Sequence, residues 1–402
     1  MKINIYVILT LVAMAASALA YPWILRFAER HGIVDNPNAR KLQRVPVPVL
    51  GGMVVYTGIL VGDIVLSLLI MSPVMAWSVL AATIMLVVGT LDDMRNLSAV
   101  RRLLIEVLVV GGFILITGNN INDFHGLWGL HELPMSVSFP LSLVAGVGII
   151  NAVNLIDGVD GYSSGYSIMA CCFFGIMFWE IWNPRFVCMN LIMIGALIPF
   201  FLHNVFGIRS KMFIGDGGTL MLGMFMTIFV FYSLGSGNRC SMLEERSIGL
   251  LAFTLAVLCV PVFDTLRVMT ARMIRGKSPF APDKTHLHHL FIDMGFSHLG
   301  AAVSILSMNL LIVIAWFVLW RLGASIDVQT YAVVAMGLLV TAGLYKFMKY
   351  QQNSGPLDED GYPQGTKLWH AACRVGEFSH FEKGTIWRMM TKLMDWRISS
   401  SL

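Results

Sequence analysis

Eleven segments of predominantly apolar residues follow one another closely along this chain, and no other feature constrains its fold as strongly. A membrane-spanning helix needs about 20 such residues. The segments are 4–24, 53–71, 75–91, 103–118, 138–153, 164–182, 187–204, 213–234, 247–266, 301–320 and 328–347. Only 13% of the residues are charged, whereas soluble proteins carry about 25%. The sequence therefore predicts an all-α, polytopic membrane helix bundle with about eleven spans and a transmembrane domain at residues 1–350.

Basic residues lie almost entirely on one side of this bundle if the N-terminus is outside. The exceptions among the 28 Lys and Arg residues are Lys2, Arg185, Arg239, Arg246 and Arg321. Because loops rich in Lys and Arg stay in the cytoplasm, we expect an inner-membrane protein with a cytoplasmic C-terminus. Residues 1–20 are similar to a signal peptide, but cleavage would leave the basic segment 26–44 outside, so we expect the first helix to be retained.

Residues 351–402 are more polar and form a predicted cytoplasmic tail. The run from Asp358 to Gly361 is typical of a linker. Between Phe381 and Arg397, Trp and Met residues alternate with Lys and Arg. Two readings fit this pattern: an amphipathic helix at the anionic inner leaflet, or a tail helix packed on the transmembrane domain.

Four polar segments fall on the predicted cytoplasmic side, although the topology was assigned only from the apolar segments and the basic residues. They are Asp92-Asp93 with Arg102, the stretch from Asn151 to Gly161, the sequence from Gly215 to Thr219, and the histidine-containing segment from Pro282 to His289. Carboxylate and amide oxygens suit Mg²⁺ or Mn²⁺, and glycines let backbone approach a phosphate closely. Arginine and histidine side chains can neutralise phosphate charge. Together the segments predict metal-dependent phosphoryl transfer at the membrane surface.

Each segment alone has a plainer interpretation. An Asp pair at a helix end is usually a cap, and Gly-Asp-Gly-Gly is usually a turn. The three histidines alone could bind zinc, although the second ligand pair of a structural site is missing. Outside these segments, we expect an interhelical hydrogen bond from Asp63 and support of the following loop from Asp264. We assign no role to His125, His131, His203 and His298.

The four segments resemble those of the polyprenyl-phosphate N-acetylhexosamine-1-phosphate transferases. The similarity runs from about Asp35 to Gly300 and includes Arg40-Lys41 followed by the stretch from Pro46 to Gly52. The resemblance implies transfer of a sugar 1-phosphate from a UDP-N-acetylhexosamine to a polyprenyl phosphate such as undecaprenyl phosphate, with release of UMP. In that family the reaction begins the synthesis of lipid-linked cell-envelope polysaccharides. Dimers occur in the family, and nothing in the sequence indicates binding of nucleic acid.

The resemblance also implies roles for individual residues. Asp92 would deprotonate or orient the lipid phosphate, and the histidines would close over the sugar and pyrophosphate. The implied catalytic residues are Asp92, Asp93 and Arg102. The implied Mg²⁺ or Mn²⁺ ligands are Asn154 and Asp216. The implied substrate-binding residues are Asn151, Asp157, Asp160, Lys284, His286, His288 and His289.

Several positions depart from the family pattern. The sequence has Gln43 where His is common, Arg102 where Lys is usual, Ala99 and Glu106 in place of a usual Pro and Gln, and Thr219 in place of Ser. Glu106 adds a negative charge near the implied site. The Lys-Thr-His-Leu-His-His sequence is similar to the GlcNAc branch, so GlcNAc-1-phosphate is the expected group, with another N-acetylhexosamine as the alternative. A secondary transporter is the alternative from a different class, but it would show repeats and midplane acids.

Overall fold

The computed structural model describes residues 3–36, 45–70, 75–279, 284–356, 363–380 and 384–399, which are almost entirely helical. The predicted linker at 358–361 and the basic pair Arg40-Lys41 lie outside the described residues. The longer elements are α1 (Ile3–Arg30), α2 (Gly51–Ile70), α3 (Ala76–Arg95), α4 (Ala99–Thr117), α5 (Met135–Leu155), α6 (Tyr162–Glu180), α7 (Pro184–Phe206), α8 (Gly215–Ser233), α10 (Leu250–Val257), α11 (Cys259–Ile274), α13 (His298–Arg321) and α14 (Ile326–Leu338). The shorter ones are strands β1 (Val34–Asp35) and β2 (Val47–Pro48), the 3₁₀ turn η1 (Leu127–Gly129), α9 (Ser241–Glu244), α12 (Leu287–Asp293), the π-turn η2 (Leu339–Gly343), α15 (Leu344–Gln352), α16 (Lys367–Phe378) and α17 (Thr385–Ser399).

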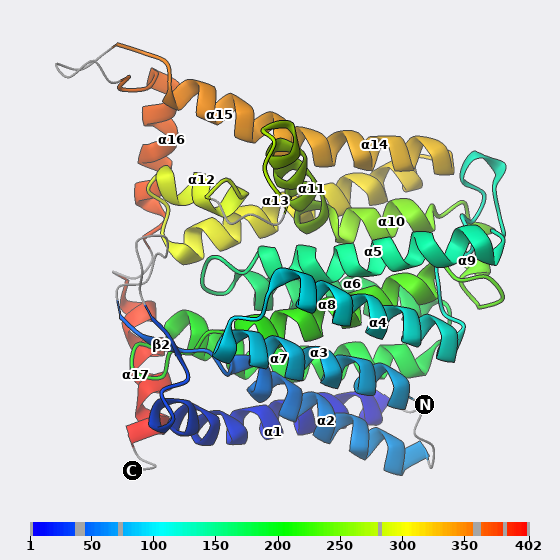
Figure 1. The fold of residues 1–402 in the computed structure, drawn as a ribbon, viewed down its shortest axis with the longest axis horizontal. Helices are drawn as coiled ribbons and strands as arrows, with labels where there is room; N and C mark the ends of the chain where they lie inside the picture. Colours follow the sequence, from blue (N-terminus) through cyan, green and yellow to red (C-terminus); the bar gives the residue numbers. More distant parts are fainter. Residues whose placement is uncertain are drawn as a thin grey trace.

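The all-α membrane bundle predicted from the apolar segments is confirmed, since every one of them coincides with a helix or a broken pair of helices. Figure 1 shows these helices lying side by side, with the two termini at opposite ends of the bundle. Within the described residues, eight helices are long and apolar enough to span a membrane, or nine if one bent pair counts as a span. Helix α4 is not among these eight, because Arg101, Arg102 and Glu106 all lie within its 19 residues.

Helix α8 lies at the centre of the bundle and is almost completely buried. It packs against α3 and α5, and α3 approaches it so closely that a Cβ on Gly89 would lie 2.4 Å from the backbone of Asp216. Only glycine fits at such a contact. The packing of α3 on α8 therefore fixes the position of Asp216 relative to the end of α3.

The sequence suggested one continuous helix for the ninth segment, 247–266, but the structure divides it into two. Helices α10 and α11 meet at an angle of 75°. The break is stabilised by Asn309 of α13, whose Oδ1 accepts from Val260 N at 2.9 Å and whose Nδ2 donates to the carbonyl of Val257 at 3.1 Å. Inside a membrane protein, a helix break persists only when such partners satisfy the freed backbone groups.

The polar positions of α2 and of the tail differ from the simplest expectations. Asp63 is buried in α2, and its Oδ1 has no hydrogen-bond partner among the described residues, so the expected interhelical bond is not found at this atom.

Helices α16 and α17 run across the end of the bundle at a steep angle to the spanning helices (Figure 1). Helix α17 packs on α7 through Trp387 and Phe206, whose rings are 4.9 Å apart, while Ile386 and Met389 stay exposed. The tail helix is thus both packed and amphipathic.

Candidate active site

The turn between α3 and α4 brings the first two polar groups together. Asn96 ends α3 in the left-handed conformation (φ 50°), and Ser98 begins α4 by accepting from Arg101 N. The Oδ1 atom of Asp92 accepts from Leu97 N at 2.7 Å, which fixes the carboxylate at the turn. Its Oδ2 lies 3.2 Å from Arg102 Nη1.

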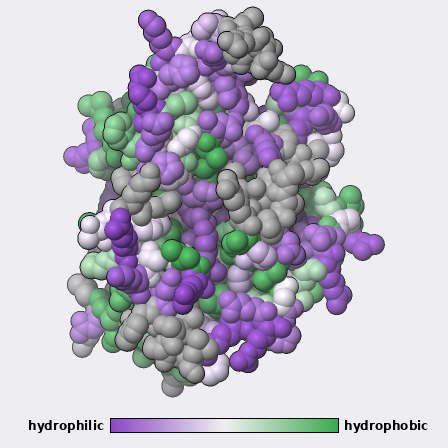
Figure 2. Space-filling model, turned by 90° about the vertical axis from the view of Figure 1, so that its left-hand side faces the viewer, coloured by the Kyte–Doolittle hydropathy of each residue, from purple (hydrophilic) through white to green (hydrophobic). Residues whose placement is uncertain are grey.

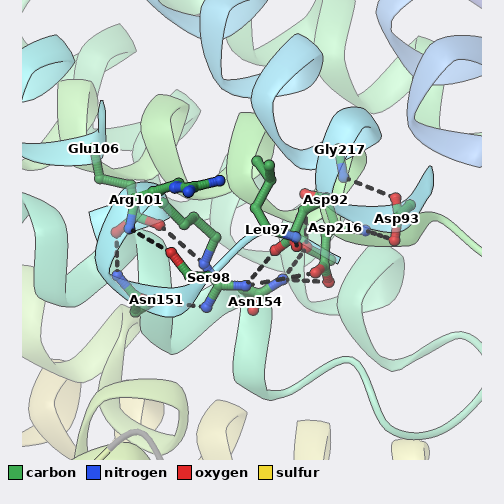
Figure 3. Close-up of polar contacts among 12 residues, drawn as sticks. Asp92, Asp93, Leu97, Ser98, Arg101, Glu106, Asn151, Asn154, Asp216 and Gly217 are labelled. Carbon is green, nitrogen blue, oxygen red and sulfur yellow. Dashed lines mark hydrogen bonds and ion pairs between the residues drawn. The ribbon is translucent and has the colours of Figure 1, made fainter. Parts of the chain in front are cut away.

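The N-terminus of α8 is held by the neighbouring acid, Asp93. Its two oxygens accept from the backbone N–H groups of Asp216 at 3.1 Å and Gly217 at 3.3 Å (Figure 3). Carboxylates are stabilised at helix N-termini by these donors and by the helix dipole. Gly215 has φ 71°, and a Cβ there would lie 2.6 Å from Asp93 Oδ2, so the contact requires glycine.

The guanidinium of Arg102 joins groups from four helices. Its Nη1 lies 3.2 Å from Asp92 Oδ2 and 3.5 Å from Asp216 Oδ2, and its Nη2 donates to Asn151 Oδ1 at 3.4 Å. Its Nε lies 3.5 Å from the buried Glu106 carboxylate. Asp92 and Asp216 therefore contact the same nitrogen of Arg102.

Two asparagines of α5 complete this cluster. Asn151 donates to Glu106 through a short contact, which ties α5 to α4. Asn154 donates to Asp216 Oδ1 at 2.9 Å and to Thr219 Oγ1 at 2.8 Å. Thr219, which stands where Ser is usual in the family pattern, thus supplies a hydroxyl that accepts from Asn154.

The loop between α5 and α6 carries two acids in different environments. Loss of hydration in the crowded cavity wall raises the pKa of Asp157 to about 7, although Ser163 donates to it at 2.6 Å. Burial opposes ionisation of Asp160 as well, but the hydrogen bond of His298 and the charge of Lys211 outweigh it and lower the pKa of Asp160. The ammonium of Lys211 lies 2.6 Å from the Asp160 carboxylate.

The histidine segment is supported from α11, as the sequence predicted for Asp264. One oxygen of Asp264 lies 2.9 Å from His286 Nδ1 and accepts from Leu287 N at 3.1 Å. Burial and the neighbouring histidines hold the pKa of His288 well below its usual value, so this imidazole is neutral near pH 7. A Cβ on Gly158 would lie 2.0 Å from His288 Nε2, so the imidazole lies directly against the α5–α6 loop.

These groups face one cavity of about 590 Å³ at the end of the bundle where the tail helices lie. Figure 2 looks onto this end, where hydrophilic residues gather. The predicted site residues that line the cavity are Asp92, Asp93, Asn154, Asp157, Asp160, Asp216, His286, His288 and His289. Arg102 contacts the lining residues Asp92 and Asp216, and Asn151 contacts Arg102. Within the described chain, Lys284 is the predicted residue that is exposed and outside the lining.

Several lining residues were missed by sequence reasoning. His298, to which no role was assigned, lies 3.0 Å from Asp160 Oδ2. Arg272 lines the cavity beside the histidines, and Asn204 accepts from Gly161 N at 2.7 Å. None of these residues belongs to a short motif, although the basic residues could have been considered because they flank the predicted polar segments.

The acidic cluster has the donor set of a divalent-cation site. The carboxylates of Asp92 and Asp216 adjoin each other, and Asp93 lies on the same helix end. Like charges so close are unfavourable unless a cation separates them, and Arg102 is the one cation that contacts both Asp92 and Asp216 among the described residues. Carboxylate and amide oxygens suit Mg²⁺ or Mn²⁺. The residues therefore fit the predicted metal.

Comparison with known proteins finds a family match and similar transferases. Residues 75–234 match the family model described as glycosyl transferase family 4. The chain is 29% identical over 293 residues to the probable undecaprenyl-phosphate N-acetylglucosaminyl 1-phosphate transferase of Bacillus subtilis, covering 73% of this chain and 78% of that protein. It is 28% identical over 292 residues to the undecaprenyl-phosphate alpha-N-acetylglucosaminyl 1-phosphate transferase of Yersinia pestis, covering 72% and 77%. For the protein of that name in Escherichia coli K12, the identity is 29% over 286 residues, covering 70% and 74%.

The fold and the site define a polytopic membrane enzyme with a carboxylate-rich cavity at one end of its helix bundle. Over residues 75–234 the chain is similar to glycosyl transferase family 4, and the resemblance stated from its four polar segments is confirmed. The matched region contains Asp92, Arg102 and Asp216, whereas the histidine segment follows it.

Proposed function

We propose that this protein transfers GlcNAc-1-phosphate from UDP-GlcNAc to undecaprenyl phosphate and releases UMP. The observation that carries the proposal is the meeting of Asp92 and Asp216, from separate helices, on the single guanidinium of Arg102. This arrangement suits a reaction in which two phosphate groups must approach each other. The names of the relatives support the choice of sugar and lipid.

The reaction joins two anionic phosphates, so the protein must position them and neutralise their charge. An oxygen of the lipid phosphate forms a bond to the β-phosphorus of the UDP-sugar. The bond from the β-phosphorus to the bridging oxygen breaks, and UMP leaves with that oxygen. In this scheme Asp92 accepts the proton of the lipid phosphate, or orients its oxygen, and Arg102 neutralises the phosphates. Attack is direct, without a covalent enzyme intermediate.

Asp216 and Asn154 are the proposed ligands of Mg²⁺ or Mn²⁺, which when bound neutralises pyrophosphate charge. Asp93 is better suited to positioning than to proton transfer, because both its oxygens accept from the backbone of α8. Asn151 has a similar supporting position between Arg102 and Glu106.

Asp157, Asp160 and the histidines are the proposed nucleotide-sugar contacts. They line the same cavity as Asp92, Asp93 and Asn96 at the α3–α4 turn. Neutral His288 can donate a hydrogen bond to the sugar or the pyrophosphate without adding a fixed charge. We further propose that the cavity opens to the cytoplasm from the inner membrane, since the basic loops lie at this end.

The proposal is tested by measuring UMP release from a panel of UDP-sugars by the purified protein with Mg²⁺ and undecaprenyl phosphate. We expect release with UDP-GlcNAc that depends on the lipid. Release with another UDP-N-acetylhexosamine alone would correct the sugar. Absence of release with every UDP-N-acetylhexosamine would refute the proposed reaction.

A further inference from the structure

A second group of chemistry-bearing side chains lies at the end of the bundle opposite the active-site cavity. The α4–α5 connection forms a short hairpin in which Asp123 pairs with Glu132 and Phe124 N donates to His131 O at 3.2 Å. The hairpin is followed by α5 and preceded by α4, whose 19 residues rise about 28 Å from the Arg102 end. Any ligand bound here is therefore separate from the catalytic cluster.

Three ligand atoms converge where this hairpin meets α9. Asp123, His131 and Glu244 each offer one nitrogen or oxygen, and these atoms all lie within 4.8 Å of one another. The hairpin supplies Asp123 and His131, and α9 supplies Glu244. The three residues thus come from two segments that are far apart in the sequence.

A buried histidine supports the two acids from the inside. The Nδ1 atom of His125 lies 3.3 Å from Glu244 and 3.8 Å from Asp123, and its side chain is only 1% exposed. His125 adopts φ 47°, which is uncommon for a residue with a side chain. Its backbone N–H donates to Asp123 Oδ1 at 2.7 Å, which fixes the carboxylate at the hairpin.

The distances and charges suit a metal ion better than simple ion pairs. The separation of His131 Nδ1 and Glu244 Oε1 is 3.4 Å, longer than the roughly 2.7–2.9 Å of a charge-assisted hydrogen bond. Ligands about 2.0–2.1 Å from a tetrahedral zinc ion are about 3.3 Å from each other. Among the ion pairs of the described residues, Asp123 and Glu244 are partnered by histidines alone, so two adjacent carboxylates lack a permanent cation.

We propose that Asp123, His131 and Glu244 bind a zinc-type divalent transition-metal ion. Imidazole nitrogen with two carboxylates is a ligand set that zinc accepts, and a water completes the tetrahedron. His125 orients the two carboxylates as a hydrogen-bonding neighbour of the ligands. The ion fastens the α4–α5 hairpin to α9 and stabilises this end of the bundle, with no part in the transfer reaction.

The test is the zinc content of the purified full-length protein after loading with ZnCl₂ and removal of unbound metal. The variants are His131→Asn and Glu244→Gln, and Glu245→Gln is the matched control because this neighbouring acid is exposed. We expect the wild type and Glu245→Gln to hold about one zinc ion more per chain than either variant. Zinc should raise the thermal midpoint of the wild type but leave that of His131→Asn unchanged.

The variant Asp216→Asn distinguishes the proposed site from zinc binding in the catalytic cavity, because this variant should still bind the additional ion. Equal zinc content in the wild type and His131→Asn would overturn the proposal. His131 is largely exposed, so its replacement leaves the fold intact and decides the question even if Glu244→Gln fails to fold. Transferase activity of His131→Asn should equal that of the wild type.

Discussion

Asp93 accepts a hydrogen bond from the backbone N–H of Asp216 at 3.1 Å, so one acid of the adjacent pair holds the helix that presents the proposed metal ligand. The two residues come from α3 and α8, which pack through Gly89. The two adjacent acids therefore have different contacts. Asp92 faces Arg102, and Asp93 faces the start of α8.

Replacement of Asp93 by Asn should misplace Asp216 without removing a reacting group. An amide can accept from only one of the two N–H groups, and a small displacement of a catalytic group can cost about 100-fold in rate. We expect kcat to fall by about that factor, whereas Asp92→Asn and Asp216→Asn abolish UMP release. Asp293→Asn, at an exposed acid outside the cavity, is the control and should retain wild-type kcat. Wild-type kcat in Asp93→Asn would contradict the positioning role.

Arg102 can be compared directly with its neighbour Arg101. Arg102→Gln removes the charge that contacts Asp92 and Asp216, and kcat/KM should fall by about 100-fold or more, as for loss of a charged group at a transition state. Arg101 is exposed, and Arg101→Gln should keep kcat/KM within about twofold. Equal effects of the two substitutions, measured by initial rates of UMP release, would argue against a specific role of Arg102.

Gly158 should tolerate no side chain. A Cβ at this position would overlap the imidazole of His288, so Gly158→Ala must displace the histidine from the cavity wall. We expect a large loss of kcat/KM for UDP-GlcNAc. Gly148→Ala is the matched control on α5, where nothing lies within 4 Å of an added Cβ. If Gly158→Ala is as active as this control, His288 does not contact the substrate as proposed.

The neutral state of His288 predicts a pH dependence of stability. Its folded pKa is lowered, so below about pH 6.5 the unfolded chain binds a proton that the folded protein does not. The free energy of unfolding should therefore decrease as the pH falls below 6.5, by up to about 1.4 kcal/mol per pH unit from this group. Between pH 5 and 7.5, the thermal midpoint of His288→Asn should depend less on pH than that of the wild type. The exposed His370→Asn is the control and should keep the wild-type slope.

The tail should influence nucleotide-sugar binding through Asp395. Its Oδ1 accepts from the backbone N–H groups of Arg209 at 3.2 Å and Ser210 at 3.1 Å, directly before Lys211, which pairs with Asp160. Asp395→Asn should raise KM for UDP-GlcNAc severalfold with little change in kcat. Glu377→Gln on α16 is the comparison variant, and equal KM values for the two would show that the contact is not needed for binding.

Much of the fold follows from the sequence because the lipid environment leaves few choices. Apolar runs of spanning length must form helices, and all eleven expected segments are helical. The break between α10 and α11 could not be predicted, since it depends on Asn309 in a later helix. The missing partner of Asp63 Oδ1 has a similar cause, because a hydrogen bond between helices depends on packing that the sequence does not state.

The site was predictable where its residues form compact motifs. Asp92, Asn154 and Asp216 each lie in a recognisable segment, and the structure brings them together. The partners of Asp160 were missed because Lys211 and His298 come from other elements, with nothing local to connect them. Long-range ion pairs of this kind are a product of tertiary packing.

The central claim is that the sugar and its phosphate are transferred together. The most direct measurement uses UDP-GlcNAc labelled at the β-phosphate, with undecaprenyl phosphate and Mg²⁺, and follows the label into the lipid. We predict that label and sugar enter the lipid in equal amounts, that unlabelled UMP is released, and that Asp216→Asn gives neither product. Release of labelled UDP, with unlabelled phosphate in the lipid product, would contradict the account.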